Sequence, residues 1–398
     1  MTWSTPLNST RRRLLVGVSA LIIAAKFSPT FAADKEAVTF AIITSLSGPQ
    51  AEYGKQAVDL ATLFADKMNA SGGISGRKVE ILTGDHQDQP DVFISLARRY
   101  AAEHKISGFL GLSGSGLSLA FEKAMKSTQI PIMLHYVWGD HNTGPDLPSV
   151  FRVGPFNSYV AGLMAKFLIE KNYKSVVVLA EDTAYGTDYA AGLKAAIGNK
   201  VKVDIIDYQA QATDLSPVLG DLAQRDPQPD AIVTAGNYQI IYNLQNQVPA
   251  AGLKSQIIGS WDYPTTPQYW ETSGKNGIGI IYSSFTGPSM RLTPTGEAFR
   301  EMFAGKYGRD PVFYEYFLWD DFNALRVAIE KSGSTEPATL TKTLPDVDFE
   351  GTMRQIRFER KPDTPIWNQA LAGTLFLKQM TAQGQSDAQA KVIYEASP

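Results

Sequence analysis

The chain has 398 residues, 44% of them hydrophobic, with a formal net charge of −3 and no cysteine. This length exceeds that of one ordinary domain and the hydrophobic content supports real cores, so we expect two lobes. The charge balance argues against nucleic acid or an anionic membrane surface as a partner, and the missing cysteines exclude disulfides, a cysteine nucleophile and a lipid-modified cysteine.

The first residues have the pattern of an export signal. Three arginines, Arg11–Arg13, precede the apolar run Leu14–Ala25, which has signal length and is too short to span a bilayer. Small residues at Thr30 and Ala32 suit cleavage, so we expect a signal peptide over residues 1–32. The arginine run also fits a twin-arginine signal, which is the alternative export route. We therefore expect a periplasmic protein that is not a lipoprotein.

The opening of the remaining chain predicts one βαβ unit. Val38–Thr44 is rich in β-formers, Tyr53–Met68 has a helical pattern, and Val79–Thr83 is β-rich again. Helical patterns separate further β-rich runs at Gly108–Leu112, Ile130–Leu134, Ser175–Leu179, Val201–Tyr208, Ala231–Ala235 and Gln256–Ile258. This alternation favours an α/β fold with parallel sheets covered by helices on both faces.

The strand-like runs form two sets that separate near Phe151–Pro155, and the alternation breaks at Gly277–Pro288. We expect the chain to cross between the lobes near residues 151–156, 281–288 and 346–352. Several crossing segments would form a hinge that permits bending. The expected organisation is residues 33–153 plus 286–348 for lobe 1, and residues 154–285 plus 349–398 for lobe 2.

Several segments resemble the periplasmic binding proteins of ABC importers for leucine, isoleucine and valine. They are Leu46–Gly54, Asn69–Lys78, Phe151–Pro155, Asp182–Gly186, and Ala250–Lys254 ahead of Ile257–Gly259. The resemblance implies the type I periplasmic binding fold, in which two doubly wound parallel-sheet lobes close on a ligand. It also implies a small-molecule ligand and an ABC permease in the inner membrane as partners. We expect a monomer without a cofactor.

The loop Gly111–Ser118 follows a strand and opens a helix. The N-terminus of a helix presents unpaired N–H groups that suit a carboxylate, and the hydroxyls of Ser113 and Ser115 can donate beside Gly114. In the family that the chain resembles, a serine matching Ser115 binds the ligand carboxylate. The alternative is a helix cap and tight turn that touches no ligand.

Two tyrosines match aromatic positions of the same family. Tyr53 matches a residue on the rim of the cleft, and Tyr185 matches one that closes over the ligand. As isolated aromatics, both would otherwise be explained by packing. The resemblance therefore adds Tyr53 and Tyr185 to the expected ligand contacts.

Other positions depart from the amino-acid-binding pattern. Tyr136 and Trp138 replace a small polar pair, and Asn237 and Tyr238 replace an aromatic pair. Trp261 falls on the position of the acid that binds the ligand's ammonium, and Asp262 follows one residue later. Replacing that acid by an indole removes the charge match and adds a flat apolar wall, so we expect a small hydrophobic carboxylate, aromatic or bulky. The alternative is a one-residue slip, in which Asp262 restores amino-acid binding.

Catalytic patterns are weak in this sequence. His135, Asp140 and His141 lie close together but have no helical histidine pair or cysteine beside them, so we expect no metal. The segment Gly111–Ser115 does not complete a nucleophile elbow. The leading function is an importer's binding protein. The alternatives are a binding protein that presents its ligand to a membrane sensor, and a periplasmic hydrolase.

Overall fold

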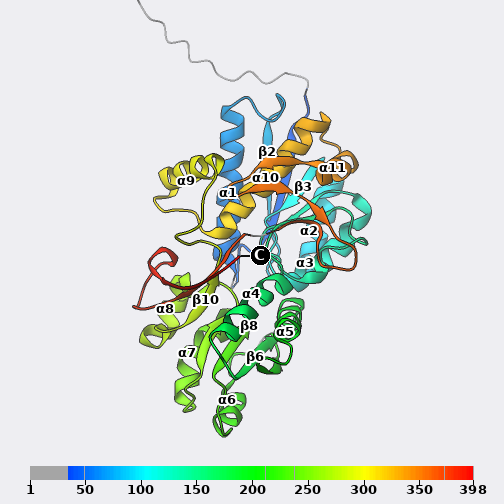
Figure 1. Cartoon of the computed structure of the whole chain (residues 1–398). Helices are drawn as coiled ribbons and strands as arrows, with labels where there is room; N and C mark the ends of the chain where they lie inside the picture. Colours follow the sequence, from blue (N-terminus) through cyan, green and yellow to red (C-terminus); the bar gives the residue numbers. More distant parts are fainter. Residues whose placement is uncertain (1–34, 49, 211, 237, 372, 398) are drawn as a thin grey trace, which may run out of the picture.

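A computed structural model describes residues 35–48, 50–210, 212–236, 238–371 and 373–397, so the expected signal peptide over 1–32 lies outside the described residues. These residues form two α/β lobes, drawn one above the other in Figure 1. In the described part of the chain, no helix is both long and apolar enough to cross a membrane.

The first lobe is built on a seven-stranded sheet of order β13-β14-β5-β4-β3-β1-β2. All neighbours pair in parallel except β13 and β14. Its strands are β1 Val38–Thr44, β2 Val79–Asp85, β3 Ile106–Leu110, β4 Ile132–Leu134, β5 Val150–Gly154, β13 Glu359–Arg360 and β14 Trp367–Leu371. Its helices are α1 Ala51–Ala70, α2 Pro90–Glu103, α3 Ser115–Met125, α9 Pro294–Tyr307, α10 Phe313–Ser332 and α11 Pro337–Thr343, and a small hairpin adds β11 Asp348–Glu350 and β12 Gln355–Arg357.

Strand β1 shows why this sheet is covered on both faces. Successive side chains of a strand point to opposite sides of the sheet. Phe40 packs against Phe64 of α1 and Phe322 of α10, with ring centroids 6.4 and 5.7 Å away. Ile43, of the opposite parity, belongs to a second buried cluster that includes Phe93 of α2. A strand buried on both faces reads as a near-continuous apolar run, as Val38–Thr44 does with threonine at only two of its positions.

The second lobe repeats this plan with the order β16-β15-β10-β9-β8-β6-β7. Strands β6 to β10 pair in parallel, whereas β15 and β16 add antiparallel strands. Its strands are β6 Ser175–Glu181, β7 Lys202–Tyr208, β8 Ala231–Ala235, β9 Gln256–Gly259, β10 Ile281–Ser284, β15 Leu375–Gln379 and β16 Lys391–Ala396. Its helices are α4 Asn157–Glu170, α5 Ala184–Ile197, α6 Ser216–Ala223, α7 Tyr238–Ala250 and α8 Pro267–Ser273.

The chain crosses between the two sheets after β5, after β10 and between β14 and β15. The expected third crossing at residues 346–352 is wrong, because β14 continues the first sheet and only β15 and β16 join the second. Strand β14 pairs with β5, and two of its side chains add hydrogen bonds to the β5 backbone. Asn368 Nδ2 donates to Val150 O at 2.9 Å and Gln369 Nε2 donates to Gly154 O at 2.7 Å. The residues assigned to lobe 2 as 349–398 are therefore divided between the lobes. A β-rich pattern identifies a strand but does not say which sheet edge it pairs with.

Candidate functional site

A cavity of about 510 Å³ lies between the two lobes. Its walls come mainly from the loops that follow the carboxyl ends of strands in both sheets. The residues that line it are Gln50, Asp88, Ser113, Gly114, Ser115, Gly116, Leu117, Tyr136, Trp138, Glu181, Thr183, Tyr185, Ala210, Ala212, Gly236 and Trp261.

The topology of the sheets explains why the cavity forms here. Strand β1 lies between β2 and β3, and β6 lies between β7 and β8, so each sheet reverses its winding direction at its first strand. Loops that leave such a point run to opposite sides and leave a crevice at the carboxyl ends of the strands, which is where open α/β sheets bind ligands. The two crevices face each other across the cavity.

The first-lobe wall is built around the start of α3. Gly114 precedes the helix with φ of 78°, a conformation that glycine adopts without strain. Ser115 is 5% exposed, and its Oγ accepts the Gly139 N–H at 3.0 Å. Because a hydroxyl can accept and donate at once, this bond leaves the Ser115 proton for a further acceptor. The first N–H groups of α3 and this hydroxyl therefore offer donors for an anion.

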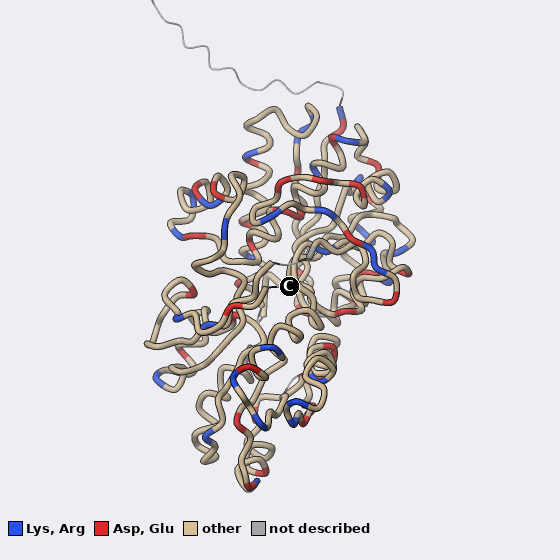
Figure 2. Tube along the Cα trace, viewed as in Figure 1, with Lys and Arg blue, Asp and Glu red and all other residues tan. Residues whose placement is uncertain are grey.

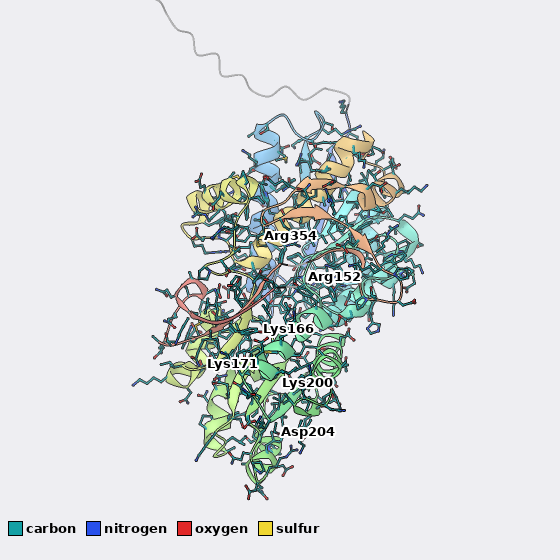
Figure 3. The ribbon with its side chains drawn as sticks, in the orientation of Figure 1. Arg152, Lys166, Lys171, Lys200, Asp204 and Arg354 are labelled. Carbon is teal, nitrogen blue, oxygen red and sulfur yellow. The ribbon has the colours of Figure 1, made fainter. Side chains whose placement is uncertain are left out.

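A buried polar network holds this wall in place. Asn142 Nδ2 donates to Ser115 O at 3.0 Å and to Glu122 Oε1 at 2.9 Å. Burial raises the pKa of Glu122 to about 8, against the opposing effects of the Asn142 hydrogen bond and the nearby Arg152 charge. Arg152, labelled in Figure 3, donates to Gly139 O at 2.9 Å, and burial lowers the pKa of its guanidinium to about 10. The network fixes the loop that carries Trp138.

Aromatic side chains from both lobes line the cavity. Tyr136 stacks on Tyr53 with a centroid distance of 5.3 Å and an interplanar angle of 12°. The Tyr136 ring also makes a T-shaped contact with the Trp261 ring of the second lobe, with a centroid distance of 6.3 Å and an interplanar angle of 81°. Trp138 lies 6.0 Å from Phe285 and 6.4 Å from Tyr185. Tyr136, Trp138, Tyr185 and Trp261 line the cavity and give it flat, apolar walls from both lobes, and Tyr53 and Phe285 support these rings by packing against them.

The second-lobe wall is set by α5 and the loops beside it. Thr183 caps α5 through the Gly186 N–H. Tyr185, in the first turn, pairs its hydroxyl with Ser260 Oγ at 2.6 Å. Burial raises the pKa of Tyr185, so the ring stays neutral. The indole Nε1 of Trp261 donates to Gly236 O at 3.3 Å, which fixes the ring against the wall.

A family model described as periplasmic binding protein matches residues 37–385. The chain belongs to the periplasmic binding protein family. One relative of this family member is the Leu/Ile/Val-binding protein homolog 3 of Brucella melitensis, 26% identical over 318 residues that cover 78% of this chain and 83% of the relative. This match agrees with the resemblance found in the sequence.

Two solved structures share the fold of this periplasmic binding protein. The branched-chain amino acid transporter substrate binding protein LivJ of Streptococcus pneumoniae, in complex with isoleucine, has a TM-score of 0.77 at 22% identity, covering 91% of this chain and 100% of that chain. A solute binding protein of an ABC transporter from R. palustris, in complex with benzoate, has a TM-score of 0.75 at 17% identity, covering 91% of this chain and 97% of that chain. At these identities the likeness shows the two-lobe fold.

The structure brings most of the expected site residues of this binding protein together. Those on the cavity wall are Ser113, Gly114, Ser115, Tyr136, Trp138, Tyr185 and Trp261. Tyr53 lies behind Tyr136 and lines a neighbouring space of only about 10 Å³. Asn237 lies outside the described residues.

Asp262 was also expected at the site, but it is not among the described residues on the cavity wall. Its side chain is 3% exposed, and burial followed by repulsion from Asp387 raises its pKa. Trp261 takes the wall position, and the chain turns into a short 3₁₀ segment directly after Asp262. The one-residue slip considered from the sequence therefore does not place this acid beside the ligand space.

Sequence reasoning missed Glu181, Thr183, Asp88 and Gln50, which also line the cavity. Glu181 ends β6 directly after an apolar run, so the rule that ligands meet the carboxyl ends of strands could have found it. In the described ranges, no group of three histidine, aspartate or glutamate side chains could hold a metal ion.

Proposed function

We propose that this protein is the extracytoplasmic substrate-binding component of an ABC importer of the branched-chain-amino-acid type. It captures a small hydrophobic carboxylate, aromatic or bulky, or an amino acid, between its closing lobes and delivers it to an inner-membrane permease. The observation that carries the proposal is the interlobe cavity, whose walls combine the N-terminus of α3 with aromatic rings from both lobes.

Each wall has a separate part in binding. The Ser115 hydroxyl and the first N–H groups of α3 receive the carboxylate, while Tyr136, Trp138 and Trp261 enclose the apolar part of the ligand. A cavity of about 510 Å³ is within the usual range for small-molecule sites. Solved proteins of the same fold bind isoleucine in one case and benzoate in another, so the scaffold accommodates both ligand types.

The surrounding surface suits a freely diffusing periplasmic monomer. Lys and Arg are interspersed with Asp and Glu over both lobes (Figure 2), and the net charge is −3. A surface of mixed charge favours solubility, and this mixture over the described residues does not favour nucleic acid or anionic lipid as a partner. The export signal expected at residues 1–32 would bring the protein to the periplasm.

A thermal-shift panel of amino acids and aromatic carboxylates tests the proposal. A ligand at 100 times its Kd stabilises the folded state by about 2.7 kcal/mol, so a true ligand raises the melting temperature clearly. At least one hydrophobic carboxylate or amino acid should do so. If none changes the melting temperature at millimolar concentration, the proposed ligand class is wrong.

Ser115→Ala and Ser118→Ala form a matched pair for the carboxylate site. Both serines are buried in α3, but Ser118 donates to Ser113 O at 3.3 Å and does not line the cavity. Ser115→Ala should weaken the bound carboxylate by about 1–3 kcal/mol through loss of a charge-assisted hydrogen bond. Ser118→Ala should leave ligand affinity unchanged. Equal affinity of Ser115→Ala and the wild type would remove Ser115 from the site.

A further inference from the structure

A short segment of the first lobe contacts the second lobe beside the cavity. Residues 139–142 follow the cavity residue Trp138 in the connection between β4 and β5. The Asp140 N–H donates to Asp188 Oδ2 of α5 at 2.9 Å, and His141 Nδ1 lies 3.1 Å from Asp188 Oδ1. Strands β4 and β5 belong to the first sheet and α5 packs on the second, so Asp140, His141 and Asp188 form an interlobe contact.

The interlobe contact adjoins the ligand space on both lobes. Helices α3 and α5 lie next to each other where the lobes meet (Figure 1). On α5, Asp188 is three residues after Tyr185, so the two side chains share a face of the helix, and Tyr185 lines the cavity. On the first lobe, the Gly139 N–H donates to Ser115 Oγ at 3.0 Å and the next N–H, that of Asp140, donates to Asp188. One residue therefore separates the proposed carboxylate site from the interlobe contact.

The donors of Asp188 come from the opposite lobe. Its side chain is only 11% exposed, whereas that of His141 is 76% exposed. A carboxylate in this position has exchanged much of its water for the Asp140 N–H and the imidazole, and it loses both when the lobes separate. Asp140 itself is held near the chain crossing, because its Oδ1 accepts the Ser158 N–H at 3.0 Å at the start of α4. The interlobe contact therefore favours the arrangement in which the lobes are together.

Other ionisable groups act on the interlobe contact. Arg152 of β5 is fully buried, and its charge interacts with Asp140, Asp188 and Glu122 of α3. Burial raises the pKa of Asp140, and it raises the pKa of Glu122 to about 8. The pH dependence of ligand binding therefore contains contributions from these acids, which have to be separated from that of His141.

We propose that Asp188 is a positioning residue for ligand binding, which holds the two lobes together beside the cavity through Asp140 and His141. Asp188 is not among the described residues that line the cavity. The inference rests on the proposed function and adds how its closed arrangement is stabilised. The apparent affinity of a site falls with the fraction of molecules that are competent to bind. Loss of the interlobe contact should therefore weaken every ligand, and it should act mainly on the rate of release.

His141 makes the interlobe contact depend on pH. Histidine side chains gain their charge between about pH 8 and pH 5, and a charged imidazole attracts the Asp188 carboxylate more strongly than a neutral one. Protonation therefore stabilises the closed arrangement, and the contribution of His141 to affinity rises as the pH falls. Because His141 is largely exposed, this contribution is limited to about two- to fivefold in affinity.

Release kinetics test the role of Asp188. The probes are leucine, phenylalanine, benzoate and 4-hydroxybenzoate, and the one that binds the wild type most tightly is used throughout. In Asp188→Ala its dissociation rate constant should rise at least about fivefold, while its association rate constant stays within about twofold. Asp221→Ala changes an exposed aspartate of α6 on the same lobe and should leave both rate constants unchanged.

A purely structural defect would lower the number of binding sites per molecule and leave the dissociation rate constant as it is. An unchanged dissociation rate constant in Asp188→Ala therefore overturns the inference without touching the proposed function. If Asp188→Ala does not melt cooperatively, Asp188→Asn replaces it. That variant keeps an acceptor for the Asp140 N–H but loses the charge, so its dissociation rate constant should rise about twofold at pH 5.5, and no rise overturns the inference.

Affinities at pH 8 and pH 5.5 test the part of His141. The gain in affinity on acidification should be about two- to fivefold larger in the wild type than in His141→Gln or Asp188→Asn. Asp140 and Glu122 remain in all three proteins, so their contributions cancel in this comparison. His104→Gln removes another exposed histidine of the first lobe and should retain the wild-type profile. Equal profiles of the wild type and His141→Gln overturn the role of His141. Failure of all four probes to bind the wild type refutes the proposed function, and this inference with it.

Discussion

The substitution Gly116→Ala should change the stability of the protein and its ligand affinity in opposite directions. It is the second residue of α3, it lines the cavity, and a Cβ built on it would meet no other atom within 4 Å. Helical Cβ atoms tilt toward the N-terminus of their helix, so the methyl group of Gly116→Ala projects into the space proposed for the carboxylate. The fold itself has room for this methyl group.

The two effects should have opposite signs. Alanine in place of a helical glycine stabilises the folded state by about 0.5–1 kcal/mol, and in a chain of this size such a gain raises the melting temperature by about 1 °C. The same methyl group displaces the carboxylate from the N–H groups of α3. Losing a hydrogen bond to a charged group costs about 1.5–3 kcal/mol, or about 10- to 150-fold in affinity.

The assay is a melting curve of the free protein followed by titration with the best ligand of the panel. Gly220→Ala is the control, because Gly220 also lies in a helix with open space at its Cβ position but is not on the cavity wall. Both variants should be stabilised, and only Gly116→Ala should lose affinity. Wild-type affinity in Gly116→Ala would refute the placement of the carboxylate at the start of α3.

Other predictions concern the scaffold. Burial raises the pKa of Glu122 to about 8, so the folded state holds a proton that the unfolded state releases above its ordinary pKa of about 4.5, and stability falls as pH rises toward 8. Glu122→Gln should flatten the dependence of the melting temperature on pH between about 6.5 and 8, and an unchanged slope would exclude Glu122 as its source. Lys378→Met removes the buried ammonium that lies 2.6 Å from Asp387 Oδ2 and leaves this half-buried carboxylate with hydroxyl donors only, from Tyr282, Ser284 and Thr286, so it should cost about 1.5–3 kcal/mol in chemical denaturation. Lys361→Met, in an exposed pair with Glu359, should cost at most about 1 kcal/mol, and similar costs for the two variants would contradict the role of burial.

Local sequence patterns made the positions of many helices and strands predictable. The run Val38–Thr44 coincides with β1, and the helical pattern at Tyr53–Met68 lies within α1 at Ala51–Ala70. Apolar periodicity is a property of neighbouring residues, so it survives without knowledge of the partners. Ser113 and Ser115 could be selected for the same reason, because a strand, a glycine turn and a helix start follow one another within a few residues.

Strand pairing was less accessible from the sequence. Only three residues separate β14 from β15, yet the two strands belong to different sheets. The residue pattern of this region did not indicate that change of sheet. The pairing of β14 depends on Gln369 and Asn368 meeting the backbone of β5, more than two hundred residues earlier in the chain. Such a contact depends on how distant segments meet, which a local pattern does not record.

The sequence by itself determined the α/β class, the two-lobe plan and the donor-rich start of α3, because these follow from local periodicity and from motifs of a few residues. Only the tertiary structure decided the composition of the second wall. It placed Glu181 on the cavity and Asp262 away from it, although Glu181 ends one strand and Asp262 follows another strand of the same sheet. The direction of a side chain after a strand ends depends on the twist of the sheet and on the neighbouring loops. The acid that faces the ligand space is therefore fixed by packing between segments that are far apart in the chain.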